Sequence, residues 1–91
     1  MNAKFQPGTV VATPGAVEAL AESGQDAGFF LDMHLQGNWG EVDADDQNAN
    51  DQALIDGSRL LSSYRTLKGV VIWVLTEADR SSTAILLPEN Y

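Results

Sequence analysis

The sequence predicts a single α+β domain, residues 1–91, in which three N-terminal helices pack on a three-stranded antiparallel meander, with a fourth strand left open. Two observations support this class. Helical spacing and helix-capping residues precede Arg59, and three strand-length apolar runs follow it. A length of 91 residues with 44% hydrophobic content fits one compact domain and leaves no room for a second core.

The first expected helix is Pro14–Ser23, which follows a short apolar run at residues 10–12. Thr13 is a suitable N-cap because its hydroxyl can accept a hydrogen bond from a free amide of the first turn. Pro14 fits the first helical position, where a missing N–H costs nothing. Gly24 can adopt the left-handed conformation that ends many helices.

The second expected helix covers residues 27–36, with Asp26 as its N-cap and Gly37 at its end. It is the most apolar of the three. Trp39 lies in the tight connection that follows. We expect its indole to fill a gap in the core, with stacking on a ligand as the alternative.

The third expected helix covers residues 43–56, with Asp43 as N-cap and Gly57 as terminator. Its apolar face is narrow, so it should lie on the surface. Its acidic cluster fails the EF-hand pattern, because Asn48 replaces the required glycine and Leu54 stands where the bidentate glutamate belongs. Carboxylates near the positive end of a helix dipole explain the cluster, and no metal site is predicted.

Three strand-length runs follow, at Leu60–Arg65, residues 70–76 and residues 82–87, and Pro88 ends the last of them. The short polar connections between the runs predict an antiparallel meander. Both faces of the middle run are apolar. It should therefore be the central strand, covered on both sides by this chain or on one side by a second subunit.

Charge and composition exclude several classes of function. Thirteen acidic and five basic residues give a formal charge of −8, which repels nucleic acid and suits either solubility or a basic protein partner. The absence of cysteine excludes disulfide scaffolds and thiol chemistry. No apolar stretch suggests a signal peptide or a membrane span, so we expect a cytoplasmic protein. We expect no cofactor. The small size makes a homodimer an open alternative.

The candidate chemistry lies in the polar residues 76–83 between the last two runs. Glu77 and Arg80 are the catalytic candidates, because an RNA-cleaving site needs a carboxylate base and a guanidinium for phosphate. His34 is the third candidate if the fold brings it near. The alternative is a structural turn in which Asp79 caps backbone amides and Arg80 pairs with Glu77.

A second group of residues could form a binding surface around this polar segment. Convergence of His34, Trp39 and Tyr64 on residues 76–83 would define a pocket, and their dispersal would remove the case for an enzyme. The binding candidates are Asp79, Ser81, Thr83, Trp39 and Tyr64.

Five stretches of the chain resemble a family of small uncharacterised bacterial proteins carried on plasmids and mobile elements and sometimes associated with type I restriction genes. They are residues 11–16, 34–40, 59–64, 76–83 and 87–91. The resemblance spans nearly the whole chain and implies an accessory role without a mechanism. The order of elements is also similar to the barnase-like fold, but no histidine lies in or after the expected strands, which argues against ribonuclease activity.

Three interpretations of function follow. The favoured one is a non-enzymatic cytoplasmic accessory protein of a mobile element that acts by protein binding. The second is a small barnase-like phosphodiesterase or toxin that uses Glu77 and Arg80. The third is an acidic DNA mimic acting against restriction, with its charge row on the helix that begins after Asp43.

Overall fold

The computed structural model describes residues 3–91. Each predicted helix and strand is present with its ends within one residue of the expected bounds, and one strand precedes them. In chain order the elements are β1 (Thr9–Ala12), α1 (Pro14–Ser23), α2 (Ala27–Leu35), α3 (Ala44–Asp56), β2 (Leu60–Arg65), β3 (Val71–Thr76), β4 (Ser82–Leu86) and the 3₁₀ helix η1 (Pro88–Asn90).

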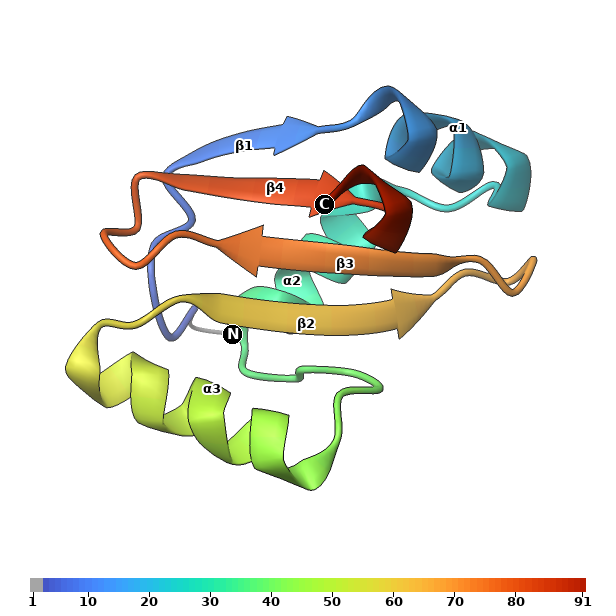
Figure 1. Cartoon of the computed structure of the whole chain (residues 1–91). Coiled ribbons are helices and arrows are strands. Elements are labelled where there is room, and N and C mark those ends of the chain that lie inside the picture. Colours follow the sequence, from blue (N-terminus) through green and yellow to red (C-terminus); the bar gives the residue numbers. More distant parts are fainter. Residues whose placement is uncertain (1–2) are drawn as a thin grey trace.

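The sheet has the order β1-β4-β3-β2 (Figure 1). The predicted antiparallel meander is confirmed for β2, β3 and β4. The expectation that helices come first and that the sheet is purely antiparallel is wrong, because β1 pairs in parallel with β4. Val10 lies opposite Thr83 and Ala12 opposite Ile85. Three helices and two strands separate these partners in the sequence, so no local pattern could reveal their pairing.

The helix ends follow the local capping chemistry. The N-caps predicted at Thr13, Asp26 and Asp43 are confirmed, since each side chain accepts a hydrogen bond from an amide of the first turn. Gly24 and Gly57 end α1 and α3 with φ angles of 68° and 80°, the left-handed region. Short-range hydrogen bonds therefore fix where α1 and α3 start and stop.

The main core lies between one face of the sheet and helices α1 and α2, and α2 crosses behind the sheet in Figure 1. Its buried members are Ala16, Ala19, Leu20, Phe30, Tyr64, Ile72, Val74 and Ile85. The third helix differs from the expectation, because α3 lies beyond β2 at the edge of the sheet and not over its face (Figure 1). It buries only Asn50 and Ala53, which confirms that it is a surface helix.

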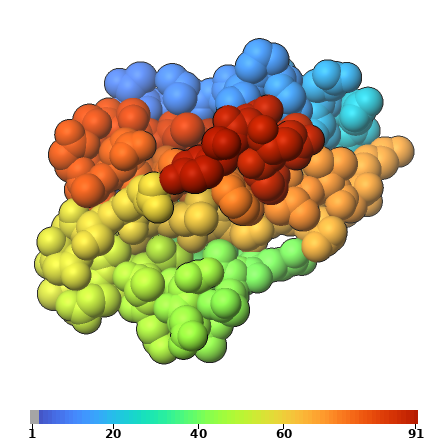
Figure 2. All heavy atoms as spheres, viewed as in Figure 1, coloured from blue at the N-terminus to red at the C-terminus, as the bar shows by residue number. Residues whose placement is uncertain are grey.

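The other face of the sheet is covered in part by the C-terminal segment, coloured red across the front of Figure 2. Trp73 of β3 is half-buried there and packs edge-on against Tyr91, with 5.9 Å between the ring centroids. The prediction that β3 is a central strand is therefore confirmed, and this chain's own C-terminus supplies cover on its second face.

None of the helices within residues 3–91 has the length and apolar character needed to cross a lipid bilayer.

Candidate functional site

The predicted polar segment, residues 76–83, forms the connection between β3 and β4. The Arg80 amide donates to the Glu77 carbonyl at 2.9 Å, and Arg80 has a positive φ of 61°. The Asp79 carboxylate accepts a hydrogen bond from the Ser81 amide at 3.0 Å. Hydrogen bonds from the Ser81 side chain and backbone lower the pKa of Asp79 below its ordinary value. The predicted capping role of Asp79 is thus confirmed.

Arg80 turns its guanidinium inward. It donates to the carbonyl oxygens of Ser58 at 2.6 Å and of Ala53 at 3.0 Å, near the C-terminal end of α3. It also donates to the backbone carbonyls of Glu77 and Ala78 and lies over the ring of Phe5. The negative end of the helix dipole favours a cation at this place. Arg80 therefore joins the β3–β4 connection to α3.

The expected ion pair between Arg80 and the Glu77 carboxylate is wrong. Arg80 bonds the Glu77 carbonyl, and the Glu77 side chain is exposed to solvent. Within residues 3–91 the one ion pair joins Arg65 to Glu41. The carbonyl groups at the end of α3 compete successfully for the guanidinium because they are fixed in place, whereas an exposed carboxylate gains little from pairing.

Replacement of Arg80 by alanine should lower the free energy of unfolding by about 2 kcal/mol, since hydrogen bonds from a charged donor are lost near partly buried carbonyls. Glu77→Ala is the matched control on the same turn and should change it by less than about 0.5 kcal/mol. Urea denaturation followed by circular dichroism measures both. Equal effects of the two substitutions would contradict the structural role of Arg80.

His34 is fully buried on α2 and belongs to a chain of polar contacts through the core. Its Nδ1 lies 2.6 Å from the Ser62 hydroxyl, and its Nε2 lies 2.9 Å from the Thr76 hydroxyl. The hydroxyl oxygens of Thr76 and Thr83 are 2.7 Å apart. Thr83 donates to the Pro7 carbonyl at 2.8 Å. The network therefore connects α2, three strands and the segment before β1.

The Pro7 carbonyl determines the direction of every proton in this network. Thr83 has one hydroxyl proton and gives it to the Pro7 carbonyl, so in the next bond Thr76 must be the donor. The Thr76 oxygen then accepts from His34 Nε2–H. In the neutral imidazole Nδ1 is consequently an acceptor, and Ser62 donates to it. His34 is held as its Nε2–H tautomer.

Burial, together with the smaller effect of the nearby positive charge of Arg80, lowers the pKa of His34 from 6.5 to about 4. A Ser–His contact could suggest a nucleophile. Here His34 and Ser62 have no exposed surface, and Thr76 replaces the carboxylate that would orient a catalytic imidazole. This geometry offers no approach for a substrate.

The remaining predicted site residues do not converge on a pocket with residues 76–83. Trp39 is 4% exposed, and its indole donates to the Asp51 carboxylate at 3.0 Å. The expectation of core packing for Trp39 agrees with this placement. Tyr64 is equally buried and donates to the Asn38 carbonyl, and burial raises the pKa of Tyr64 to about 12. Both side chains stabilise the interior.

Ser62 was not among the predicted site residues, and Thr76 was included only as the first residue of the polar segment 76–83. A signal for them exists in the strand pattern, because Ser62 alternates with Leu60 and Tyr64 on the core-facing side of β2. A hydroxyl at a core position needs a hydrogen-bonding partner, and the lone histidine was the available one.

A pocket of about 190 Å³ lies between α3 and β2. None of the predicted site residues lines it; its walls are Val42, Asp46, Ala49, Asn50, Arg59 and Leu61. Within residues 3–91, no three side chains of histidine, aspartate or glutamate lie close enough to hold a metal ion.

The β2 edge of the sheet is closed by other parts of the chain. The side-chain NH₂ group of Asn50 donates to the backbone carbonyl of Leu61 at 2.8 Å. Its side-chain oxygen accepts from the backbone N–H of Leu61 at 3.1 Å. The backbone groups of Ser63 pair with Trp39 and Glu41, at 3.1 and 2.6 Å. Leu61 and Ser63 direct their backbone groups away from β3, so these bonds occupy the positions where a further strand would pair with them.

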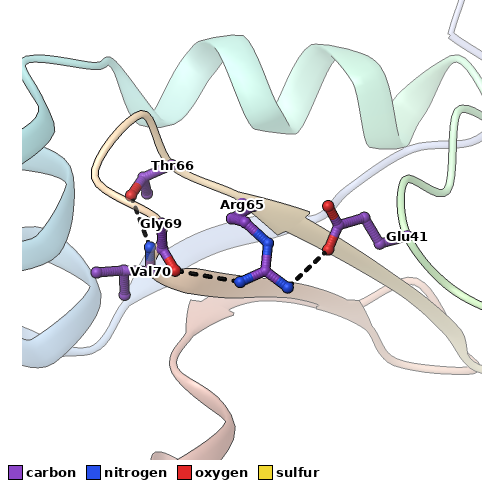
Figure 3. Close-up of polar contacts among 5 residues, drawn as sticks. All are labelled: Glu41, Arg65, Thr66, Gly69 and Val70. Carbon is purple, nitrogen blue, oxygen red and sulfur yellow. Dashed lines mark hydrogen bonds and ion pairs between the residues drawn. The ribbon is translucent and has the colours of Figure 1, made fainter.

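At the far end of this edge, side chains join neighbouring segments of the chain (Figure 3). Arg65 forms an ion pair with Glu41 at 3.3 Å and donates to the Gly69 carbonyl at the same distance. The Thr66 hydroxyl accepts from the Val70 amide at 3.1 Å in the adjoining turn. Glu41 and Arg65 thus tie the segment beside β2 to the strand's end.

The β1 edge is open. Thr9 and Thr13 donate to carbonyls of Ser81 and Ile85 beside them, so the alternate residues Val10 and Ala12 direct their backbone groups away from β4. Within residues 3–91, β1 has β4 as its one neighbouring strand, and β1 forms the upper rim of the molecule in Figure 2. All four β1 side chains are exposed.

No known protein family, curated protein or solved structure matches the chain. Function therefore has to be inferred from the geometry of the described residues. Among these, the buried His34 network is inaccessible, whereas β1 presents unpaired backbone groups and apolar side chains to solvent.

Proposed function

We propose that this protein is a non-enzymatic binding module that recognises another protein by accepting an extended segment of it at the β1 edge. The observation that carries the proposal is the pair of outward-facing residues, Val10 and Ala12, whose N–H and C=O groups have no strand partner within residues 3–91. Strand addition uses such groups for affinity and the neighbouring side chains for specificity.

The contrast between the two edges supports this proposal. Natural proteins protect open edges with short strands, charged residues, proline or a covering segment, because an open edge pairs with other chains. The β2 edge has such cover from Asn50 and from the Trp39 and Glu41 backbones. β1 is short, with four residues, but within the described part of the chain it has none of the other protections. β1 carries no charge and no proline, and its valines, Val10 and Val11, are 42% and 51% exposed. An edge left in this state is suited to binding.

The resemblance to plasmid-borne and mobile-element proteins supplies the proposed setting. In that setting the module acts in the cytoplasm as an accessory of a mobile element, and binding of another protein is its whole activity. The inward position of Arg80 and the burial of His34 support a binding role in preference to phosphodiester chemistry, which would need both groups at a surface.

The proposal is tested with a capped peptide, Val-Thr-Val-Thr-Val, titrated into the ¹⁵N-labelled protein. The amides of Val10 and Ala12 should shift and become protected from hydrogen exchange, because they gain partners. The Val11 amide faces β4 and should change little. A peptide with N-methyl groups at alternate residues cannot complete the pairing and should not bind. If the peptide protected amides elsewhere from hydrogen exchange and left those of Val10 and Ala12 unaffected, the proposal would be overturned.

A pair of proline variants provides a control within the protein. Val10→Pro removes an N–H that points to solvent, so it should abolish peptide binding while the fold is kept. Val11→Pro removes an N–H directed at β4 and leaves its carbonyl partner unpaired, so it should destabilise the protein by about 1–3 kcal/mol. Thermal denaturation and the peptide titration measure the two effects. Undiminished peptide binding by a folded Val10→Pro variant would contradict strand addition.

A further inference from the structure

We infer that the segment bound at β1 is basic, with lysine or arginine on both sides of its extended core. This inference rests on the proposed function and specifies the chemistry of the partner. It is based on the charges of the elements that flank β1.

Carboxylates flank β1 at both ends. Its N-terminal end lies against the β3–β4 connection, where the Thr9 amide donates to the Ser81 carbonyl at 3.0 Å. Gly8 allows this approach, since a Cβ there would lie 2.3 Å from the Ser81 oxygen. That connection exposes Glu77 and Asp79 to solvent. The C-terminal end of β1 leads into α1, which exposes Glu18 and Glu22.

The cations of the chain lie elsewhere. Arg59 directly precedes β2 and Arg65 ends it, at the opposite edge of the sheet. Lys68 lies in the β2–β3 turn, next to Leu67, whose amide donates to the Gln25 side chain just after α1. Lys4 lies against Gly37, after the end of α2. Arg80 is the one cation in the elements that flank β1, and its guanidinium is directed to backbone carbonyls. The open edge is therefore uncharged along its length and acidic at both ends, which favours a basic segment.

The same charges argue against a second copy of this chain as the occupant. Antiparallel pairing of two β1 strands would place the start of one strand beside the end of the other. The carboxylates of Glu77 and Asp79 would then approach those of Glu18 and Glu22 in the other copy. Each copy also carries a formal charge of −8, so association would have to overcome repulsion.

The experiment compares three capped peptides that share the core Val-Thr-Val-Thr-Val and are flanked by lysine, glutamine or glutamate. Binding is measured by the amide shifts of Val10 and Ala12. The lysine peptide should bind about tenfold more tightly than the glutamine peptide, as two or three exposed charge pairs allow. The glutamate peptide should bind most weakly, and the differences should shrink at high salt.

Matched variants locate the charges that matter. Glu18→Gln with Glu22→Gln should reduce the preference for the lysine peptide at least about threefold, since two exposed charge pairs are lost and each contributes modestly. Asp45→Asn with Asp46→Asn removes the same charge from α3, beside the β2 edge, and should leave the preference unchanged. If both double variants lost the preference for the lysine peptide equally, the placement of the partner's charges beside β1 would be wrong.

The outcomes separate this inference from the proposed function. If all three peptides bind β1 equally, or the glutamate peptide binds best, strand addition stands and the basic partner is wrong. If none protects Val10 and Ala12, the proposed function itself fails. Sedimentation showing a dimer whose formation protects these two amides would identify a second copy as the occupant and would also overturn the inference.

Discussion

Replacement of His34 by alanine is expected to lower the free energy of unfolding by about 4 kcal/mol, enough to unfold many small domains. Two costs combine. The imidazole is fully buried and packs edge-on against Phe5 and Trp39, with ring centroids 5.2 and 5.6 Å apart, so its removal leaves a cavity. Ser62 and Thr76 also lose their hydrogen-bond partner inside the core.

Two further substitutions separate packing from hydrogen bonding. His34→Phe keeps an aromatic ring but leaves both hydroxyls without a partner. His34→Gln keeps one donor for Thr76 and one acceptor for Ser62, and should be the least destabilising of the three. Urea denaturation followed by circular dichroism ranks the variants. A His34→Phe variant as stable as the wild type would show that the polar network contributes nothing.

A double substitution tests the coupling directly. If the cost of His34→Phe arises from the unpaired hydroxyl of Ser62, then adding Ser62→Ala should recover part of the lost stability. In the wild-type background Ser62→Ala should destabilise, because it removes the donor to Nδ1. If the double variant lost as much unfolding free energy as the two single variants together, the unpaired Ser62 hydroxyl would not be the cause of the His34→Phe effect.

The parts of the fold that the sequence predicted are those controlled by neighbouring residues. Thr13 and Asp43 cap helices through amides three positions along the chain, so the helix starts are visible in a short window. The sequence did not predict β1 as a strand because its partner, β4, lies beyond three helices and two other strands. The run at residues 10–12 is too short to indicate a strand without that partner.

The candidate site was misjudged for a similar reason. Arg80 was expected to pair with Glu77, three positions away, but its guanidinium binds the Ala53 carbonyl 27 positions away. His34 meets Ser62 and Thr76 at separations of 28 and 42 positions. Residue type and spacing cannot reveal such contacts, because tertiary packing alone determines which polar groups share a buried environment.

Stability should also fall as the pH is lowered from 7 to 5, by about 2 kcal/mol from His34 alone. The pKa of His34 is about 4 in the folded protein and 6.5 for the unperturbed side chain. Between these two values the unfolded state binds a proton that the folded state does not. The contribution of His34 is therefore fully present above pH 6.5 and is lost as the pH falls toward 4.

His34→Gln is the control for this pH dependence, because it keeps hydrogen-bonding groups but cannot titrate. Carboxylates also gain protons as the pH falls, and this relieves the self-repulsion that accompanies a formal charge of −8, an effect that both proteins share. Asp79, with its lowered pKa, loses stabilising charge only at more acidic pH. The wild type should therefore lose more stability than His34→Gln between pH 7 and 5 in urea denaturation. Two results would show that burial does not hold the imidazole neutral. One is the same dependence of unfolding free energy on pH in the wild type and in His34→Gln, and the other is a His34 proton resonance that titrates near 6.5 in the folded protein.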